Sequence, residues 1–142
     1  MNKFISFLSI FIFIIVFTSL SFAGNGILLT DSGLKYQDLE IGAGATAEVD
    51  NIVVVHITGW LDDNGQKGEE FINSRDRGKP VSFKLSTKKV MQGWNIGVDG
   101  MKVGGKRRLM IPSELGYGRK GVDNIVPPNA DLIFEVELLE VK

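Results

Sequence analysis

The sequence predicts an α+β domain in which a mostly antiparallel sheet packs against one short helix. Strand-like patterns recur from residue 34 to residue 141, separated by Gly, Pro and Asn, while a single segment, residues 93–103, has helical spacing. A sheet of this kind must bury one face, and the only sizeable helix available to cover it is this segment. No repeat or linker divides the chain after residue 23, so we expect one domain.

The first 23 residues are typical of a secretory signal peptide. Lys3 supplies a positive charge, residues 4–17 form an apolar run broken only by serines, and small residues precede Ala23. We therefore expect cleavage after Ala23, a lead-in segment at residues 24–32 and the domain itself at residues 33–142.

An uncleaved membrane anchor is the alternative interpretation of this N-terminal segment. Its apolar run is close to the lower length limit for a membrane span, roughly 17–25 residues. Cleavage predicts a protein exported to a periplasm or secreted, which would touch the membrane only through an uncleaved signal peptide.

The strongest strand signal covers residues 52–61, and a weaker one precedes it at residues 34–39. Val53, Val55 and Ile57 alternate with their neighbours, so they share one face of the longer strand. We expect that face to be buried.

A hairpin and a further strand follow. Asn64 and Gly65 predict the turn, because both tolerate a positive φ, and residues 69–73 can return as the hairpin partner. Residues 81–85 alternate cleanly, with the odd-numbered side chains predicted to face inward.

The helical segment at residues 93–103 begins with a tryptophan between glycines. Trp94, Val98 and Met101 are spaced to line one helical face. Glycine costs a helix interior roughly 1 kcal/mol relative to Ala, so several of them predict that something packs very close to the backbone. Trp94 is then placed to form the flat floor of a small apolar pocket.

Two strands separated by a loop complete the domain. Residues 106–111 read as a strand that ends at Pro112, residues 113–129 are rich in Gly, Pro and Asn and predict a loop, and residues 131–141 alternate as the last strand.

Composition excludes several kinds of chemistry. The chain carries a formal net charge of −1, no Cys and one His, His56, within an apolar strand. Nothing here suggests nucleic-acid binding, and disulfides, thiol catalysis and His-Cys or multi-His metal sites are impossible. We expect no cofactor, and a hydrogen-bonded structural role for His56.

The aromatic residues are the remaining candidates for a site. They are Phe71 on the hairpin return, Trp94 on the helix, Tyr117 between two glycines and Phe134 on the last strand. Periodicity alone favours ordinary core positions for all four, because aromatic side chains are usually core residues.

The order and spacing of several motifs tip this balance, because together they resemble the FKBP-type peptidyl-prolyl cis-trans isomerases over residues 33–142. The motifs are Val54-Val55-His56 with Thr58-Gly59, Phe71 with Ser74-Arg75-Asp76-Arg77 and Lys79-Pro80, Val90-Met91 with Gly93-Trp94, Gly116-Tyr117-Gly118, and residues 125–130 with residues 132–138.

The resemblance implies a sheet of about five antiparallel strands around one short helix, with a ligand pocket between them. It makes Trp94 the pocket floor and Arg77 an edge residue, and it assigns hydrogen bonds to the Met91 N–H and the Tyr117 hydroxyl. The walls that it implies are Phe71, Val81, Val90, Met91, Ile125 and Phe134. Proline-containing polypeptides would be the substrates of a monomeric enzyme.

Two positions depart from the family pattern. Ile57 stands where the family usually has a Tyr, and Ile72 stands where it usually has an Asp. Arg77 therefore lacks two polar neighbours, and Lys89 adds positive charge where the family often has an acid. We expect a more apolar pocket with reduced macrolide affinity. A proline-segment-binding chaperone with little turnover is the alternative function.

Overall fold

The computed structural model describes residues 26–142, so the predicted signal peptide lies outside the described residues. The strands are β1 Leu28–Leu29, β2 Lys35–Glu40, β3 Ile52–Asp63, β4 Gln66–Asn73, β5 Val81–Lys84, β6 Lys106–Ile111 and β7 Leu132–Val141. The helices are α1 Gln92–Val98 and the 3-10 turn η1 Ser113–Leu115.

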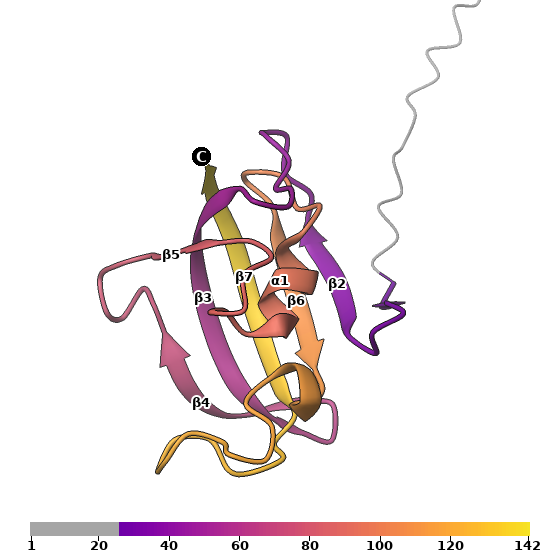
Figure 1. Ribbon diagram of the computed structural model, residues 1–142, viewed down its shortest axis with the longest axis vertical. Helices are drawn as coiled ribbons and strands as arrows, with labels where there is room; N and C mark the ends of the chain where they lie inside the picture. Colours follow the sequence, from indigo (N-terminus) through magenta and orange to yellow (C-terminus); the bar gives the residue numbers. More distant parts are fainter. Residues whose placement is uncertain (1–25) are drawn as a thin grey trace, which may run out of the picture.

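All seven strands pair antiparallel in one sheet, in the order β1-β2-β6-β7-β3-β4, with β5 also paired to β3. The long strand β3 is central. One of its edges pairs with β7, and the other pairs with β5 over residues 52–55 and then with β4 from Thr58 onward. The chain leaves the sheet between β4 and β5 and forms a projecting loop (Figure 1).

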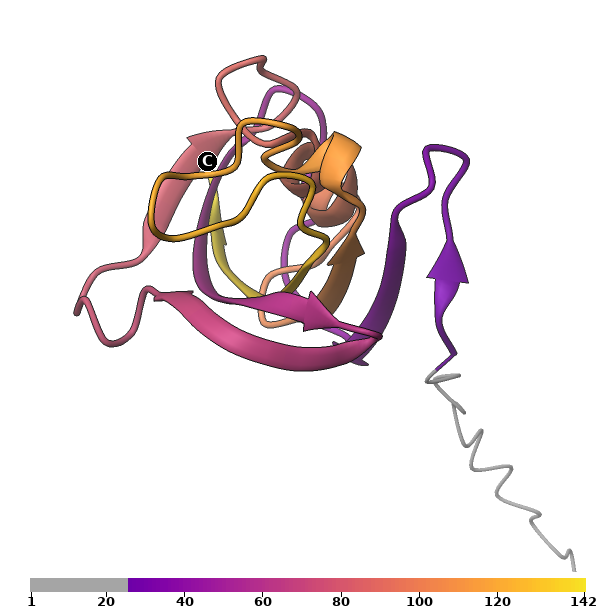
Figure 2. The same ribbon diagram turned by 90° about the horizontal axis from the view of Figure 1, so that it is seen from below.

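The sheet curls around α1, so one face is concave and buried and the other is convex (Figure 2). Strand β7 shows how the sequence produces this division. Phe134, Val136 and Leu138 are buried, whereas Glu135 and Glu137 between them are partly exposed. The predicted inward faces of residues 52–61 and 81–85 follow the same alternation. The core therefore lies between the concave face and α1.

The helix lies unusually close to the sheet because two of its residues have no side chain. A Cβ added to Gly93 would lie 2.6 Å from Ile111 Cγ2, and a Cβ added to Gly97 would lie 2.5 Å from Leu109 Cδ1. Both distances are shorter than real Cβ contacts, so a side chain at either position would force Ile111 or Leu109 to shift. The close approach predicted from the glycine content is confirmed, and the partner is β6.

The helix ends earlier than the sequence pattern predicted. It stops at Val98, because Asp99 leaves the helical conformation with a ψ of 131° and Gly100, with a left-handed φ of 80°, completes a turn. Met101 is therefore buried beyond the helix rather than within it. The Arg107 guanidinium donates to the carbonyl oxygens of Gly97 and Asp99 at 3.1 and 3.3 Å, which satisfies the helix C-terminus.

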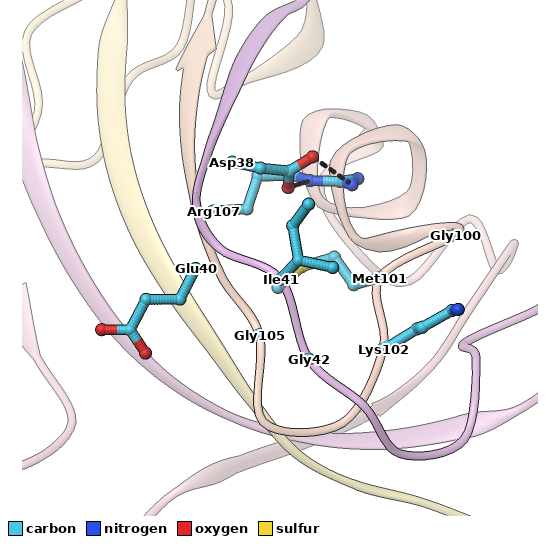
Figure 3. A pocket seen from close by; sticks show the side chains of 9 residues that line it. All are labelled: Asp38, Glu40, Ile41, Gly42, Gly100, Met101, Lys102, Gly105 and Arg107. Atoms are coloured by element: carbon cyan, nitrogen blue, oxygen red, sulfur yellow. Dashed lines mark hydrogen bonds and ion pairs between the residues drawn. The ribbon is translucent and has the colours of Figure 1, made fainter. Parts of the chain in front are cut away.

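Arg107 also links the end of the helix to β2, the strand paired with its own strand β6. Its Nε donates to Asp38 Oδ1 on β2 at 2.7 Å, and its guanidinium stacks over the Tyr36 ring at 4.3 Å. Figure 3 shows this ion pair beside a cavity of about 120 Å³ that Met101 and Ile41 also line. The cavity is small and both of its carboxylates are paired, Asp38 with Arg107 and Glu40 with Lys106, so Arg107 acts here as a structural residue.

The α+β class, the antiparallel sheet and the single α-helix are confirmed. The sheet has seven strands rather than about five, and β1 was not predicted, because two exposed leucines carry no recognisable period. Among residues 26–142, no helix is long and apolar enough to span a membrane.

Candidate active site

Three aromatic rings from three separate elements meet over the concave face. The Phe134 ring of β7 lies 5.4 Å from the Trp94 ring of α1 and 5.6 Å from the Phe71 ring of β4, with interplanar angles of 88° and 89°. Both contacts are edge-to-face, which is a favoured arrangement of aromatic pairs. The structure thus brings together three of the four aromatic residues singled out in the sequence.

A β-bulge explains how β4 contributes two neighbouring side chains to this cluster. Gly59 of β3 pairs with Ile72, but Trp60 pairs with Glu70, so Phe71 is an extra residue in β4. A bulge of this kind re-aims a side chain, and neighbouring residues no longer point to opposite faces. Phe71 and Ile72 both reach the same side of β3 as a result.

Gly59 leaves the space that these side chains occupy. A Cβ at Gly59 would lie 2.6 Å from Phe134 Cε1, 2.8 Å from Ile72 Cγ2 and 2.9 Å from Phe71 Cζ. Three side chains therefore pack directly on the glycine backbone. This contact fixes the depth at which the Phe71 and Phe134 rings lie.

A fourth ring, which the site prediction missed, supports Trp94 from β5. Phe83 lies 5.5 Å from the Trp94 ring at an interplanar angle of 33°. The signal was present in the sequence, because Phe83 was predicted to face inward, but no family motif singles it out. Its role follows from its partner: it is a second ring, besides Phe134, that packs on the indole.

The cluster carries hydrogen-bond donors that the protein leaves unused. Within residues 26–142, Trp94 Nε1 is the only buried side-chain nitrogen or oxygen without a partner. The Met91 N–H and the Tyr117 hydroxyl also donate to no group of the described chain. Burial raises the pKa of Tyr117 above its usual 10.0, so its hydroxyl stays protonated as a donor. Unused donors beside an apolar surface are typical of a binding site.

The other predicted site residues separate into three groups by burial. Val81 and Met91 are half-buried and pack against the core, as does Tyr117. Ile57 and Phe134 are fully buried, so they form the base rather than an open wall. Val90 is half-buried at the approach to α1 but does not join the core contacts.

The structure does not bring Ile125 into this group. Its side chain is 53% exposed, and it lines a separate cavity with Lys120 and Pro128. A bridge between Val122 and Val126 turns the next residue inward instead, and Val126 is buried in the core. Sequence spacing could not distinguish these neighbours, because the loop conformation decides which of them faces in.

Beside the aromatic cluster lies a cavity of about 280 Å³ that we call the Arg77 slot. It is lined by Ile72, Ser74, Arg77, Lys79, Pro80 and Val81. It opens where β4 has left β3 and β5 has not yet joined it. Arg77 is exposed and its side chain has no hydrogen bond or ion pair among the described residues.

His56 has the structural role predicted for it. Its Nδ1 lies 2.8 Å from Ser74 Oγ, which also accepts the Ile57 N–H at 2.9 Å. These contacts tie the start of the projecting loop to β3 and position the Arg77 slot. Among residues 26–142 no group of three His, Asp or Glu side chains is placed to bind a metal ion.

Several charged side chains on the convex face of the same strands form ion pairs. Glu135 accepts from Lys67 Nζ at 2.7 Å and from Arg108 Nη2 at 2.9 Å, and Lys67 lies 4.1 Å above the Trp60 ring. Burial of Glu135 acts to raise its pKa, but the hydrogen bonds and charges of its two cations outweigh burial and lower it. Arg75 forms an ion pair with Glu137 on the same face.

Comparison with known proteins shows the family to which the chain belongs. The chain is 48% identical over 109 residues to an FK506-binding protein of Neisseria meningitidis serogroup B, a match that covers 77% of this chain and 96% of the relative. It is 46% identical to the FKBP-type peptidyl-prolyl cis-trans isomerase FkpA of Escherichia coli over 83% of this chain and 41% of FkpA.

Solved structures agree. The crystal structure of FkpA from Escherichia coli superposes with a TM-score of 0.73 at 44% identity, over 82% of this chain and 52% of that one. A peptidyl-prolyl cis-trans isomerase from Pseudomonas syringae superposes with a TM-score of 0.71 at 32% identity, over 84% of each chain. Residues 44–139 match the FKBP-type family as a whole, and the chain therefore belongs to the FKBP-type peptidyl-prolyl cis-trans isomerases.

Proposed function

We propose that the aromatic pocket is the catalytic site and that the protein accelerates X–Pro isomerisation during the folding of exported polypeptides. The observation that carries the proposal is the Trp94 ring, held between Phe134 and Phe83 with its buried Nε1 unpaired. A core tryptophan would normally find a hydrogen-bond partner for this group.

The physical chemistry of the X–Pro bond suits such a pocket. Resonance gives the peptide bond a rotation barrier of roughly 18–20 kcal/mol, and uncatalysed isomerisation takes tens to hundreds of seconds. Twisting the bond removes the resonance and leaves a less charge-separated group than the planar amide. An apolar surface that excludes water therefore favours the twisted state over the ground state, and such differential binding is catalysis.

The proposed residue roles follow from this argument. Trp94 forms the floor under the proline ring, and Phe71 and Phe134 confine it. The Met91 N–H and the Tyr117 hydroxyl donate to carbonyl oxygens of the bound chain and hold it in place while the bond rotates. No general base, nucleophile or metal has a part in the reaction. Apolar walls favour substrates with a bulky apolar residue before proline.

Exchange spectroscopy by NMR on X–Pro peptides tests the site without a coupling protease. We expect the purified protein to raise the isomerisation rate, with apolar residues preferred before proline. No rate above background from protein with a folded spectrum would refute the catalytic proposal.

Export is supported by the sequence of residues 1–23, with its basic start, apolar run and small residues before Ala23. We propose that the mature protein begins at Gly24 and works in a periplasm or outside the cell. Mass spectrometry of the protein from its own host would give the mass of residues 24–142. An intact N-terminus would favour the membrane-anchored alternative.

A proline-segment-binding chaperone with little turnover is a second candidate. Ile57 and Ile72 favour it, because they make the surroundings of the rings apolar and leave Arg77 without an intramolecular carboxylate. Suppression of aggregation that survives Trp94→Ala, in a protein without isomerase activity, would support this candidate.

The same two residues bear on the binding of small ligands. The name of the Neisseria relative refers to FK506, and we propose that this chain binds that macrolide weakly, because Ile57 and Ile72 replace polar groups in the pocket surround. Calorimetric titration would measure the affinity.

We propose that the protein is a monomer, which analytical ultracentrifugation would test.

A further inference from the structure

The Arg77 slot combines an apolar lining with positive charge that nothing in the described chain neutralises. Arg77 and Lys79 both line it, and neither forms an ion pair within residues 26–142. Asp76, the acid of the same loop, is exposed and pairs with neither of them. Ser74 also lines the slot, but His56 and the Ile57 N–H occupy its hydroxyl.

The apolar part of the slot borders the aromatic cluster, because Ile72 belongs to the lining of the slot and also lies beside the rings. Ile72 packs on Gly59 beside the Phe71 and Phe134 rings, and Val81 lies at the start of β5 opposite Val55. A polypeptide with its proline over Trp94 therefore has the slot beside it. A volume of about 280 Å³ is several times the roughly 30 Å³ that one water occupies in the liquid, so an extended side chain fits.

We propose that the Arg77 slot binds the side chain of a glutamate that flanks the proline, so that the protein selects acidic substrate segments. The two methylene groups of Glu pass along Ile72 and Val81, and its carboxylate reaches the Arg77 guanidinium, with Lys79 adding to the positive field. A guanidinium presents forked donors that match a carboxylate. This inference rests on the proposed function, because it places the substrate proline over Trp94.

Ile72 is what makes the guanidinium available. A carboxylate at position 72 would lie beside the slot and compete with the substrate for Arg77. The nearby Arg75 shows the contrast, because it forms an ion pair with Glu137 and has no such vacancy. Specificity thus depends on Arg77, which, unlike Arg75 on the same loop, has no carboxylate partner in the described chain.

The test uses acetylated and amidated peptides with one apolar residue before proline, so that the only carboxylate is the one introduced. Glu, Gln or Lys is placed in turn at each flanking position, and kcat/KM is measured by exchange spectroscopy. At one position we expect Glu to exceed Gln by about fourfold at low ionic strength, with Lys below Gln. High salt should shrink the difference.

Variants locate the effect, and the Glu-to-Gln ratio within each variant removes changes in its overall rate. Arg77→Gln should bring the ratio close to one. Ile72→Asp should also bring the ratio close to one, because it supplies an internal carboxylate. Ile72→Asn, which matches the shape of Asp without its charge, should keep the preference for Glu. Arg75→Gln removes the same charge from the same loop, and it should leave the ratio unchanged.

Binding gives a readout that does not depend on turnover. Titration of the same peptides should shift the Nε–Hε signal of Arg77 with the Glu peptide and not with the Gln peptide. Equal kcat/KM for Glu and Gln at every position, in a protein active on the Gln peptides, would overturn this inference and leave the proposed function intact. Absence of all turnover, with the Glu-dependent shift of the Arg77 signal preserved, would refute the proposed function and leave glutamate binding in the slot intact.

Discussion

The charged groups around Glu135 on the convex face of the sheet are paired, whereas three donors around the aromatic cluster on the concave side are not. On the convex face, Glu135 is held by Lys67 and Arg108, and the Trp60 ring is covered by the Lys67 ammonium group. On the concave face, Trp94 Nε1 is buried without a partner, and the Met91 N–H and the Tyr117 hydroxyl donate to nothing in the described chain.

The difference shows where a ligand is expected. Alternation along β7 sends Phe134 to one face and Glu135 to the other, so a single strand builds both. Buried polar groups are normally hydrogen-bonded, and leaving one unpaired costs about 1–3 kcal/mol. Among the described residues, a buried side-chain donor is left unpaired only on the concave side. A substrate is therefore expected to bind on that side.

Substitution of the two tryptophans, one on each face, should give the largest difference between the faces. Trp94→Ala should reduce the free energy of unfolding by about 3 kcal/mol, because it opens a cavity between Phe83 and Phe134. It should also lower kcat/KM by about 100-fold through misplacement of the substrate. Urea unfolding and exchange spectroscopy measure the two effects.

Trp60→Ala is the matched control for this prediction. Its ring contacts Lys67 on the convex face, so the loss of stability should be about 1 kcal/mol, with kcat/KM unchanged. Equal loss of activity in both variants would contradict the assignment of the two faces.

Gly59→Ala should be the next largest change. The added methyl group would lie 2.6–2.9 Å from atoms of Phe134, Ile72 and Phe71, so these side chains must move. We expect a loss of about 2 kcal/mol by overpacking, together with lower kcat/KM and altered Trp94 fluorescence. Gly26→Ala, which meets no atom within 4 Å, should change none of these three quantities.

Tyr117→Phe isolates one donor. The hydroxyl has no partner in the described chain, so removing it should leave stability unchanged while kcat/KM falls about fivefold through one lost hydrogen bond to substrate. Because burial raises the pKa of Tyr117, activity should not decline with the ionisation of an ordinary tyrosine at 10.0. Tyr36→Phe, beside Arg107, should keep full activity.

Glu135→Gln is expected to have the smallest effect and to act on stability alone. The pKa of Glu135 is lowered in the folded state, so its contribution is present above its usual pKa of 4.5 and is lost as the pH falls through the folded value. At neutral pH the variant should lose about 1 kcal/mol, since the pair is partly exposed. Wild type and variant should converge in acid, and KM should stay constant.

The sequence was most informative where a repeating pattern met a buried face. The alternation of residues 52–61, the Asn64-Gly65 turn and the close packing beside the helical glycines were all predictable, because burial imposes a period and close packing excludes side chains. The length of the helix was not, because its end depends on the backbone conformation of Asp99 and Gly100 and on Arg107 from β6.

The candidate site divides in the same way. Trp94, Phe71 and Phe134 carry recognisable motifs, and the structure places them in contact. Phe83 was missed because its contact with Trp94 depends on how β5 pairs with β3. The orientations of Ile125 and Val126 depend on loop geometry, which no period in the sequence encodes.

The bulge at Phe71 has a consequence for how such a protein can diversify. Because Phe71 and Ile72 both face the pocket, residues 71–81 carry a pocket wall and the whole Arg77 slot on one short stretch of chain. Trp94 and Phe134 lie on other elements. Exchange of that stretch by recombination would therefore transplant a substrate preference as a module, without disturbing the floor on which the proline rests.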